Sequence, residues 1–266
     1  MKNSMNHVRI WWADTRGKVI ATLFVLWIVT MIHSFQPVFL INPLVAIVSM
    51  YAFDFCISRV RSGKGIVTLS SLVTGLLIGL VFDPTAAIWV LIIACLVAAF
   101  SKQFIAFGSH RHIWNPAVLG IAVTSIIFNQ SSGWWAASWG IIPVLIIVAG
   151  MTLALSQIRR VFMPFIFLGI MFVYLSFTGT WSGAFELVTS GTFIFFAFIM
   201  LPEPVTSIGG KTWLYGWPVF VGGLVVMLSV LRIFIVDPVM LALLIANAAV
   251  YVIVRHPWVT LQAPST

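Results

Sequence analysis

Two short polar motifs stand out in a chain that has only six acidic residues. Asn115 precedes Pro116 and an apolar run, so it is well placed to cap a helix whose first N–H groups could also donate to a ligand. Glu203 lies between Pro202 and Pro204, which prevent a regular helix and often mark backbone that lines a cavity or a partner surface. Each motif also has a plain structural interpretation, as a helix cap and as a helix stop.

Three further polar side chains interrupt or end apolar runs. Asn247 lies within such a run, and an amide there needs a partner in the protein interior. Asp54 precedes basic residues, and we expect it to pair with Arg59 or Lys64 in a structural role. Lys102 ends its run, where its ammonium group can reach the boundary with water.

Small residues share one face of the predicted helix at 66–82. They are Ser70, Ser71, Thr74, Gly75 and Gly79. Small residues let helix backbones approach closely, so helix packing is the favoured interpretation of this face. The alternative is that the exposed backbone admits a flat ligand.

Several kinds of site are excluded by what the sequence lacks. Cys56 and Cys95 show no CxxC spacing and lie in apolar runs, so we expect neither a disulfide framework nor a metal site. We find no phosphate-binding glycine loop and no catalytic triad order. We therefore predict no catalytic residues of the chain's own.

The composition is that of a membrane protein. Hydrophobic residues make up 61% of the chain and charged residues 8%, and the mean hydropathy is +1.12. A soluble domain is usually about 25% charged. We predict an all-α polytopic membrane protein with about ten transmembrane helices, at 19–35, 38–58, 66–82, 86–106, 115–129, 139–156, 161–177, 185–201, 214–233 and 238–254.

The basic residues give this topology an orientation. With ten crossings, thirteen of the fourteen Lys and Arg residues fall on one side and only Arg232 on the other. The positive-inside rule makes the first side cytoplasmic, with both termini there. We therefore attribute the net charge of +8 to the membrane topology and to attraction to the lipid bilayer. We do not expect nucleic acid as a partner.

Ten crossings divide into two halves of five, which would have opposite orientations, as in inverted-repeat transporters. The predicted division is a basic cytoplasmic segment, one transmembrane domain with two repeat halves and a cytoplasmic tail. These parts are 1–18, 19–254 with halves at 19–129 and 139–254, and 255–266.

Five blocks in this order resemble the RnfD/NqrB family, membrane subunits of the Rnf complex and of the sodium-translocating NADH:quinone reductase. TLSSLVTGLL at 68–77 resembles the family's SALVTGLLL, and SKQF at 101–104 its GKQLF. HIWNPA at 112–117 is similar to NIFNPA, FIFFAFIMLPEPVTS at 193–207 to MLGAFFMATDPVTSP, and LIANA at 244–248 to LLANA.

The resemblance implies a ten-helix inverted-repeat subunit of a redox-driven complex in the bacterial cytoplasmic (inner) membrane. It would bind a non-covalent riboflavin or FMN, relay electrons, and work with other membrane and flavin or iron–sulfur subunits rather than as an autonomous enzyme. Carried over, Asn115 and Glu203 would flank the flavin near the cytoplasmic face. The predicted cofactor-binding residues are Asn115, Glu203, Thr206, Ser70, Thr74, Lys102 and Asn247.

Two departures from the family pattern matter. Glu203 replaces the family's Asp, and the outward loop at 129–138, NQSSGWWAAS, has no Thr. In the family a Thr in an outward loop carries covalent FMN, so we predict no covalent FMN here. The alternative functions are a urea-channel-like transporter or permease with the same inverted-repeat fold, and a scaffold that docks a flavin-carrying partner.

Overall fold

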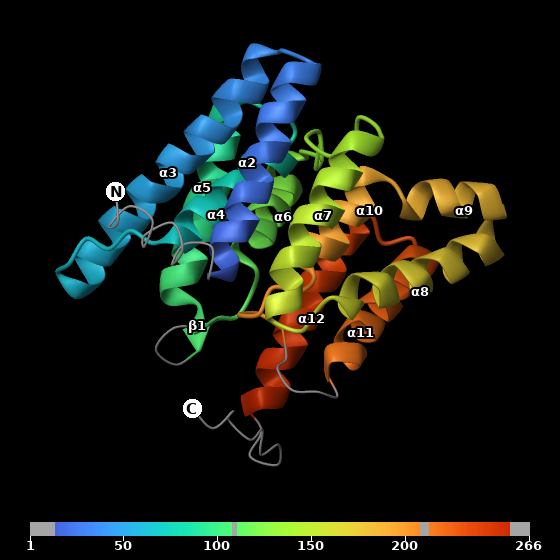
Figure 1. Ribbon diagram of the computed structural model, residues 1–266. Helices are drawn as coiled ribbons and strands as arrows, with labels where there is room; N and C mark the ends of the chain where they lie inside the picture. Colours follow the sequence, from blue (N-terminus) through green and yellow to red (C-terminus); the bar gives the residue numbers. More distant parts are fainter. Residues whose placement is uncertain (1–13, 108–110, 208–212, 256–266) are drawn as a thin grey trace, which may run out of the picture.

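The computed structural model describes residues 14–107, 111–207 and 213–255, which form a bundle of helices (Figure 1). In order these are α2 (Thr15–His33), α3 (Pro37–Ser62), α4 (Leu69–Val81), α5 (Ile88–Phe104), α6 (Pro116–Phe128), α7 (Ile141–Gln157), α8 (Phe162–Thr178), α9 (Trp181–Val188), α10 (Gly191–Phe195), the π-helix η1 (Phe196–Met200), α11 (Trp213–Val230) and α12 (Pro238–Arg255). Between α5 and α6, the two-residue strands β1 (Ala106–Phe107) and β2 (Arg111–His112) pair antiparallel.

The predicted helical class is confirmed, and a helix stands at each of the ten predicted positions. The helix predicted at 185–201 was wrong as a single element, because α9 and the continuous α10–η1 segment meet at a bend of 49°. A Cβ at Gly191 would lie 1.6 Å from the carbonyl oxygen of Ala137. Only glycine therefore allows the second part of the bent pair to begin so close to the loop at 129–138.

The helices fall into two groups by length. Three of those described, α2, α3 and α11, are long and apolar enough to cross a membrane, and the bent pair would make a fourth. Six shorter apolar helices, α4, α5, α6, α7, α8 and α12, complete the set. Together with the exposed apolar side chains on α3 and α8, they indicate a multi-pass membrane protein.

Two short segments lie in the interior. Residues 74–82, in and just after α4, and residues 194–202, in and just after α10 and η1, are buried without a gap. A short helix leaves irregular backbone at membrane depth, which is tolerated where protein surrounds it. The ends of α4, α6 and η1 are thus the places where polar groups can meet inside the bundle.

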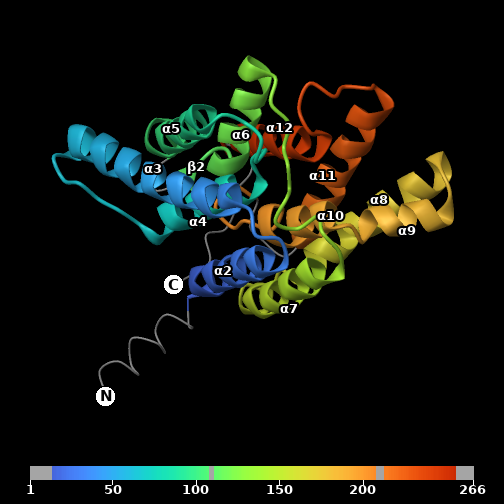
Figure 2. The same cartoon turned by 90° about the horizontal axis from the view of Figure 1, so that it is seen from above.

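Four helix pairings of the first half of the chain recur in the second half. In the first half α3 packs against α4 and α5, α5 against α6, and α2 against α4. In the second half α8 packs against η1 and α11, α11 against α12, and α7 against α10 and η1. The halves meet where α2 contacts α7 and α6 contacts α12, with the first-half helices α3 and α5 and the second-half helices α8, α9 and α11 on opposite sides (Figure 2).

The glycines of the small-residue face of α4, Gly75 and Gly79, pack against α3. A Cβ at Gly79 would lie 2.5 Å from Cα of Pro43, and one at Gly75 would lie 2.9 Å from Cα of Ile47. These glycines permit backbone contact between the two helices, as the packing interpretation predicted. Their side of α4 is therefore closed to a ligand.

Gly79→Ala tests this contact. The added methyl would force α3 and α4 apart, and we expect a loss of about 1–3 kcal/mol in stability, seen as a lower thermal midpoint in detergent. Gly223→Ala is the matched control, because nothing lies within 4 Å of its Cβ position. Equal midpoints for the two variants would contradict the close packing.

Candidate functional site

The helix break after η1 creates an irregular segment at residues 201–207. Its first carbonyl groups have side-chain partners: the indole Nε1 of Trp217 donates to the oxygen of Leu201 at 2.9 Å, and Nη1 of Arg160 donates to that of Pro202 at 3.0 Å. The carbonyl of Glu203 accepts from the hydroxyl of Ser207 at 2.6 Å. Side chains thus supply donors to the carbonyl groups of this irregular segment.

Arg160 holds this segment from the turn between α7 and α8. It is 7% exposed, and its guanidinium also donates to the hydroxyl of Ser207. Burial lowers the pKa of Arg160 from its ordinary value, while the nearby charge of Glu203 acts in the opposite direction. The cation therefore both ties the segment down and balances the acid that the segment presents.

Glu203 meets Asn115 across the interface between the halves. Nδ2 of Asn115 donates to Oε2 of Glu203 at 2.8 Å, and Oδ1 accepts from the N–H of Val118 at 3.1 Å. Asn115 is therefore both the N-cap of α6 and the partner of the acid. The role of Asn115 as a helix cap is thus compatible with a role in the candidate site.

Two more predicted residues complete the network. The hydroxyl of Thr206 donates to Oε2 of Glu203 at 3.1 Å. Oδ1 of Asn247 accepts from the N–H of Asn115 at 3.1 Å, and its Nδ2 donates to the carbonyl of Thr206 at 3.1 Å. Asn247 thus finds the interior partner that was predicted for it, and it joins α12 to both motifs.

His112 lies beside the same carboxylate. Its Nε2 is 3.6 Å from Oε1 of Glu203, and this nitrogen is buried without a hydrogen-bond partner among the described residues. Strand β2 positions the imidazole by pairing with β1, His112 standing opposite Ala106. The Nε2 atom of His112 could therefore form a further hydrogen bond at this site.

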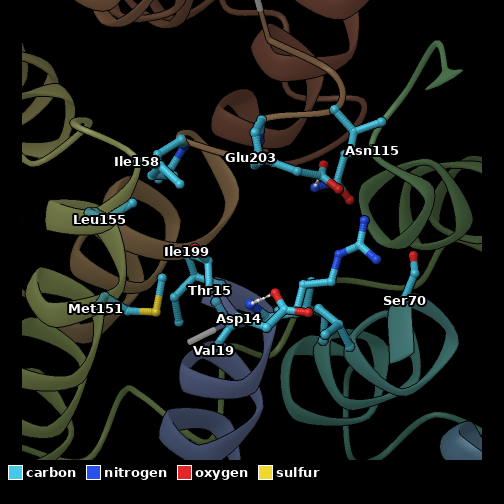
Figure 3. A pocket seen from close by; sticks show the side chains of 16 residues that line it. Asp14, Thr15, Val19, Ser70, Asn115, Met151, Leu155, Ile158, Ile199 and Glu203 are labelled. Atoms are coloured by element: carbon cyan, nitrogen blue, oxygen red, sulfur yellow. Dashed lines mark hydrogen bonds between the residues drawn. The ribbon is translucent and has the colours of Figure 1, made fainter. Parts of the chain in front are cut away.

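A cavity of about 350 Å³ opens beside the network. Its polar lining residues are Asp14, Thr15, Arg16, Ser70, Asn115 and Glu203, and its apolar ones are Val19, Val73, Leu77, Met151, Leu155, Ile158, Ile199, Pro202, Pro204 and Val205. In Figure 3 Met151, Leu155 and Ile158 of the α7 side face Ser70 across the cavity, with Glu203 and Asn115 at one end. The site is an apolar slot with hydrogen-bonding groups at its edge.

The seven predicted residues divide into three groups. Ser70, Asn115 and Glu203 line the cavity, and Thr206 and Asn247 support them. Thr74 lies one turn further along α4 and donates to the carbonyl of Ser70 at 2.8 Å. Lys102 does not line the cavity.

Lys102 pairs with Asp54, so the prediction that Asp54 would pair with Arg59 or Lys64 was wrong. Its Nζ lies 2.9 Å from Oδ2 of Asp54, and both side chains are at most 9% exposed. The hydroxyl of Ser71 donates to the same carboxylate oxygen. The expected partners Arg59 and Lys64 follow Asp54 in sequence, but α3 packs beside α5, so Lys102 reaches the acid from a neighbouring helix.

Several residues of this site were not predicted from the sequence. Arg160 was considered only as one of the basic residues of the topology, and His112 only as part of a matching block. Met151 and Leu155 of α7 had no role. Neither type nor spacing marks these residues. Met151 and Leu155 reach the cavity only because α7 packs against α2 and η1, whereas Arg160 and His112 lie beside the segment at 201–207 and do not line the cavity.

Arg160→Met tests the support of the segment at 201–207. Two acceptors lose their donor, and we expect a local loss of about 1–3 kcal/mol, measured as faster hydrogen exchange at residues 205–207. Arg159→Met is the matched control, because Arg159 is exposed. Equal exchange rates in the two variants would show that Arg160 does not hold the segment.

Comparison with known proteins identifies the family of this chain. A subunit of the ion-translocating oxidoreductase complex of Cellvibrio japonicus (strain Ueda107) is 30% identical over 110 residues, which are 40% of this chain and 31% of that protein. The match thus spans about a third of the relative's length. The pattern of the NQR2, RnfD, RnfE family matches residues 6–142, a stretch that includes Ser70 and Asn115 and ends before Glu203. Because this stretch is 137 of the 266 residues, the chain belongs to the NQR2, RnfD, RnfE family.

Proposed function

We propose that the chain is a membrane subunit of an ion-translocating oxidoreductase complex and that it binds a non-covalent flavin through which electrons pass. Family membership and the name of the C. japonicus relative support the first part. The cavity beside Asn115 and Glu203 is the observation that supports flavin binding. Electrons would come from another subunit, since no nucleotide-binding motif was found in the sequence.

The residues of the cavity suit a flavin ring. Ligand sites usually have volumes of roughly 300–1,000 Å³ and apolar walls with a few convergent polar groups, and this cavity has about 350 Å³. An isoalloxazine ring is flat and apolar on its faces and carries N–H and carbonyl groups at its edge. The uncommitted Nε2 of His112 lies at the polar end of the site.

Each group of residues would have its own task. Glu203 accepts hydrogen bonds and is kept in place by Asn115 and Thr206, so it would orient a donor at the ring edge. Met151, Leu155 and Leu77 would cover the ring faces and exclude water. When bound, the flavin supplies a carrier that accepts and donates electrons.

We further propose ten membrane crossings in two inverted five-helix repeats, with both termini on the cytoplasmic side of a bacterial inner membrane. The packing of α8 against η1 and α11, and of α11 against α12, repeats the packing of α3 against α4 and α5, and of α5 against α6. This repetition supports two inverted repeats. The distribution of basic residues supports the orientation. The cavity then opens at the cytoplasmic end, where α2, α4 and α6 begin.

The channel alternative has less support. A second cavity of about 340 Å³ lies at the other end of the bundle, beside Asp237 and the loop at 129–132, and shares no lining residue with the first. A transport pore would need free hydroxyl groups at Ser70, Thr74 and Thr192. The hydroxyl of Thr74 instead donates to the backbone carbonyl of Ser70 at 2.8 Å, and that of Thr192 lies 3.3 Å from the hydroxyl of Ser138. The electron-transfer function is the one that the cavity favours.

Cysteine labelling tests the orientation. In a Cys56→Ser background, Ser131→Cys should react with a membrane-impermeant maleimide in intact cells, because Ser131 lies in the outward loop and is exposed. Lys64→Cys should react only after permeabilisation. Labelling of Lys64→Cys in intact cells would contradict the proposed topology.

Flavin titration of purified variants tests the site. Asn115→Ser keeps an N-cap residue but removes the donor to Glu203, and Glu203→Gln removes the charge. We expect each to weaken flavin binding about tenfold, the effect of losing a hydrogen bond to a charged group, measured by quenching of flavin fluorescence.

Glu186→Gln is the matched control, because Glu186 is an exposed acid on α9. It should bind flavin as the unmodified protein does. Unchanged affinity in both site variants would remove Asn115 and Glu203 from the flavin site.

A further inference from the structure

Three cations gather at the end of α3 and in the loop that follows it. Arg59, Arg61 and Lys64 lie within six residues, and all three side chains are exposed. None of them forms an ion pair with any described residue, and the nearest acid in sequence, Asp54, is paired with Lys102. We call residues 59–67 the basic loop. Both views of the bundle show it extending outward from the other helices (Figures 1 and 2).

The basic loop is fixed against the end of α3. The hydroxyl of Ser58 accepts from the N–H of Ile66 at 2.8 Å, and the hydroxyl of Ser62 donates to the carbonyl of Ser58 at 2.8 Å. A Cβ at Gly65 would overlap the ring of Phe55, so only glycine lets the loop lie directly on that ring. The backbone that carries the cations is therefore ordered before any ligand binds.

The charged groups of the loop keep free donors. Nη1 of Arg59 donates to the carbonyl of Gly63, and Nη1 of Arg61 donates to that of Gln103 at the end of α5. A guanidinium has five N–H donors, so each retains donors for a second acceptor. The structure gives the ammonium group of Lys64 no hydrogen bond or ion pair with any described residue. An anion at the loop could therefore bind several cations at once.

Exposed apolar side chains surround these charges. Val60 is 88% exposed and Ile66 51% exposed, within the loop itself. On α5, whose end Arg61 reaches, Phe100 and Phe104 are about half exposed and their ring centroids lie 4.5 Å apart. This combination of free cations and uncovered apolar groups suits a ligand that has an anionic head and an apolar tail.

The length of α3 places the cations at the depth of lipid headgroups. The helix has 26 residues, which at 1.5 Å per residue make about 39 Å. The hydrocarbon core of a bilayer is about 30 Å thick, so α3 exceeds it even at the common tilt of about 20°. The last turns of α3 therefore reach the layer of lipid phosphates, while the apolar side chains beside them face the acyl chains.

We propose that the basic loop is a binding site for an anionic phospholipid. Arg61 and Lys64 bind the phosphate group in charge-assisted hydrogen bonds, and the acyl chains lie against Val60 and the exposed rings of α5. An acidic protein could meet the charges, but it would not use the apolar groups at membrane depth. The proposal is independent of the cavity beside Glu203 and of any flavin.

Native mass spectrometry of the protein in detergent, titrated with single lipids, tests the proposal. Phosphatidylglycerol should bind about tenfold more tightly than phosphatidylcholine with the same acyl chains, and higher ionic strength should reduce this preference. The water-soluble headgroup glycerophosphoglycerol should compete far more weakly than the lipid, because it has no acyl chains. Equal competition by the headgroup would show a site for free phosphates and would overturn the lipid proposal.

Three variants locate the site. Lys64→Gln should reduce the preference for phosphatidylglycerol, and Arg61→Gln combined with Lys64→Gln should remove it. Val60→Glu adds an acid between the cations at a position with almost no packing, so it should remove the preference without loss of thermal stability. Arg159→Gln is the matched control, because it removes an exposed cation from the turn between α7 and α8, and it should change nothing.

Equal retention of the two lipids by the unmodified protein would overturn the proposal. So would a preference that survives in the double variant and in Val60→Glu. If the lipids are retained equally and the double variant no longer co-purifies with the other subunits of its complex, the basic loop is instead a docking surface for an acidic protein. Flavin binding should be the same in all these variants, so the outcome does not depend on the proposed electron-transfer function.

Discussion

Backbone groups that lie inside an apolar bundle must all find partners, and this constraint shapes the region around Pro202. Helical hydrogen bonds stop at η1, and the side chains of Arg160 and Trp217 take over at the next carbonyl groups. The segment that they hold presents Glu203 to Asn115 of the other half. The same irregular segment therefore breaks the helix, receives the hydrogen bonds of Arg160 and Trp217, and places Glu203 in the candidate site.

Asn115 shows how closely these functions are joined. Its oxygen caps α6, its side-chain nitrogen donates to Glu203, and its backbone N–H is bound by Asn247. A buried polar network stabilises strongly when every member is paired and is costly when one is not. His112 is the member with a nitrogen still unpaired, and it faces the carboxylate at the end of the cavity where a ligand edge would lie.

Apolar runs between Gly and Pro residues were enough to predict ten helical positions, because chain in lipid has few alternatives to the helix. The two motifs at Asn115 and Glu203 were also predicted, since each breaks an apolar pattern. Contacts between distant helices were not. Lys102, and not the nearby Arg59, pairs with Asp54, and nothing in the sequence separates buried Arg160 from exposed Arg159. The bend before Gly191 depends on contact with Ala137, which no local pattern reveals.

The central claim is that this bundle holds a flavin between α4 and α7 beside Glu203. It is tested most directly by the visible absorption spectrum of the protein purified from membranes, with mass spectrometry of the extracted cofactor. The account predicts flavin absorption bands and a flavin that denaturation releases intact. A colourless protein that takes up no flavin when flavin is added would contradict it.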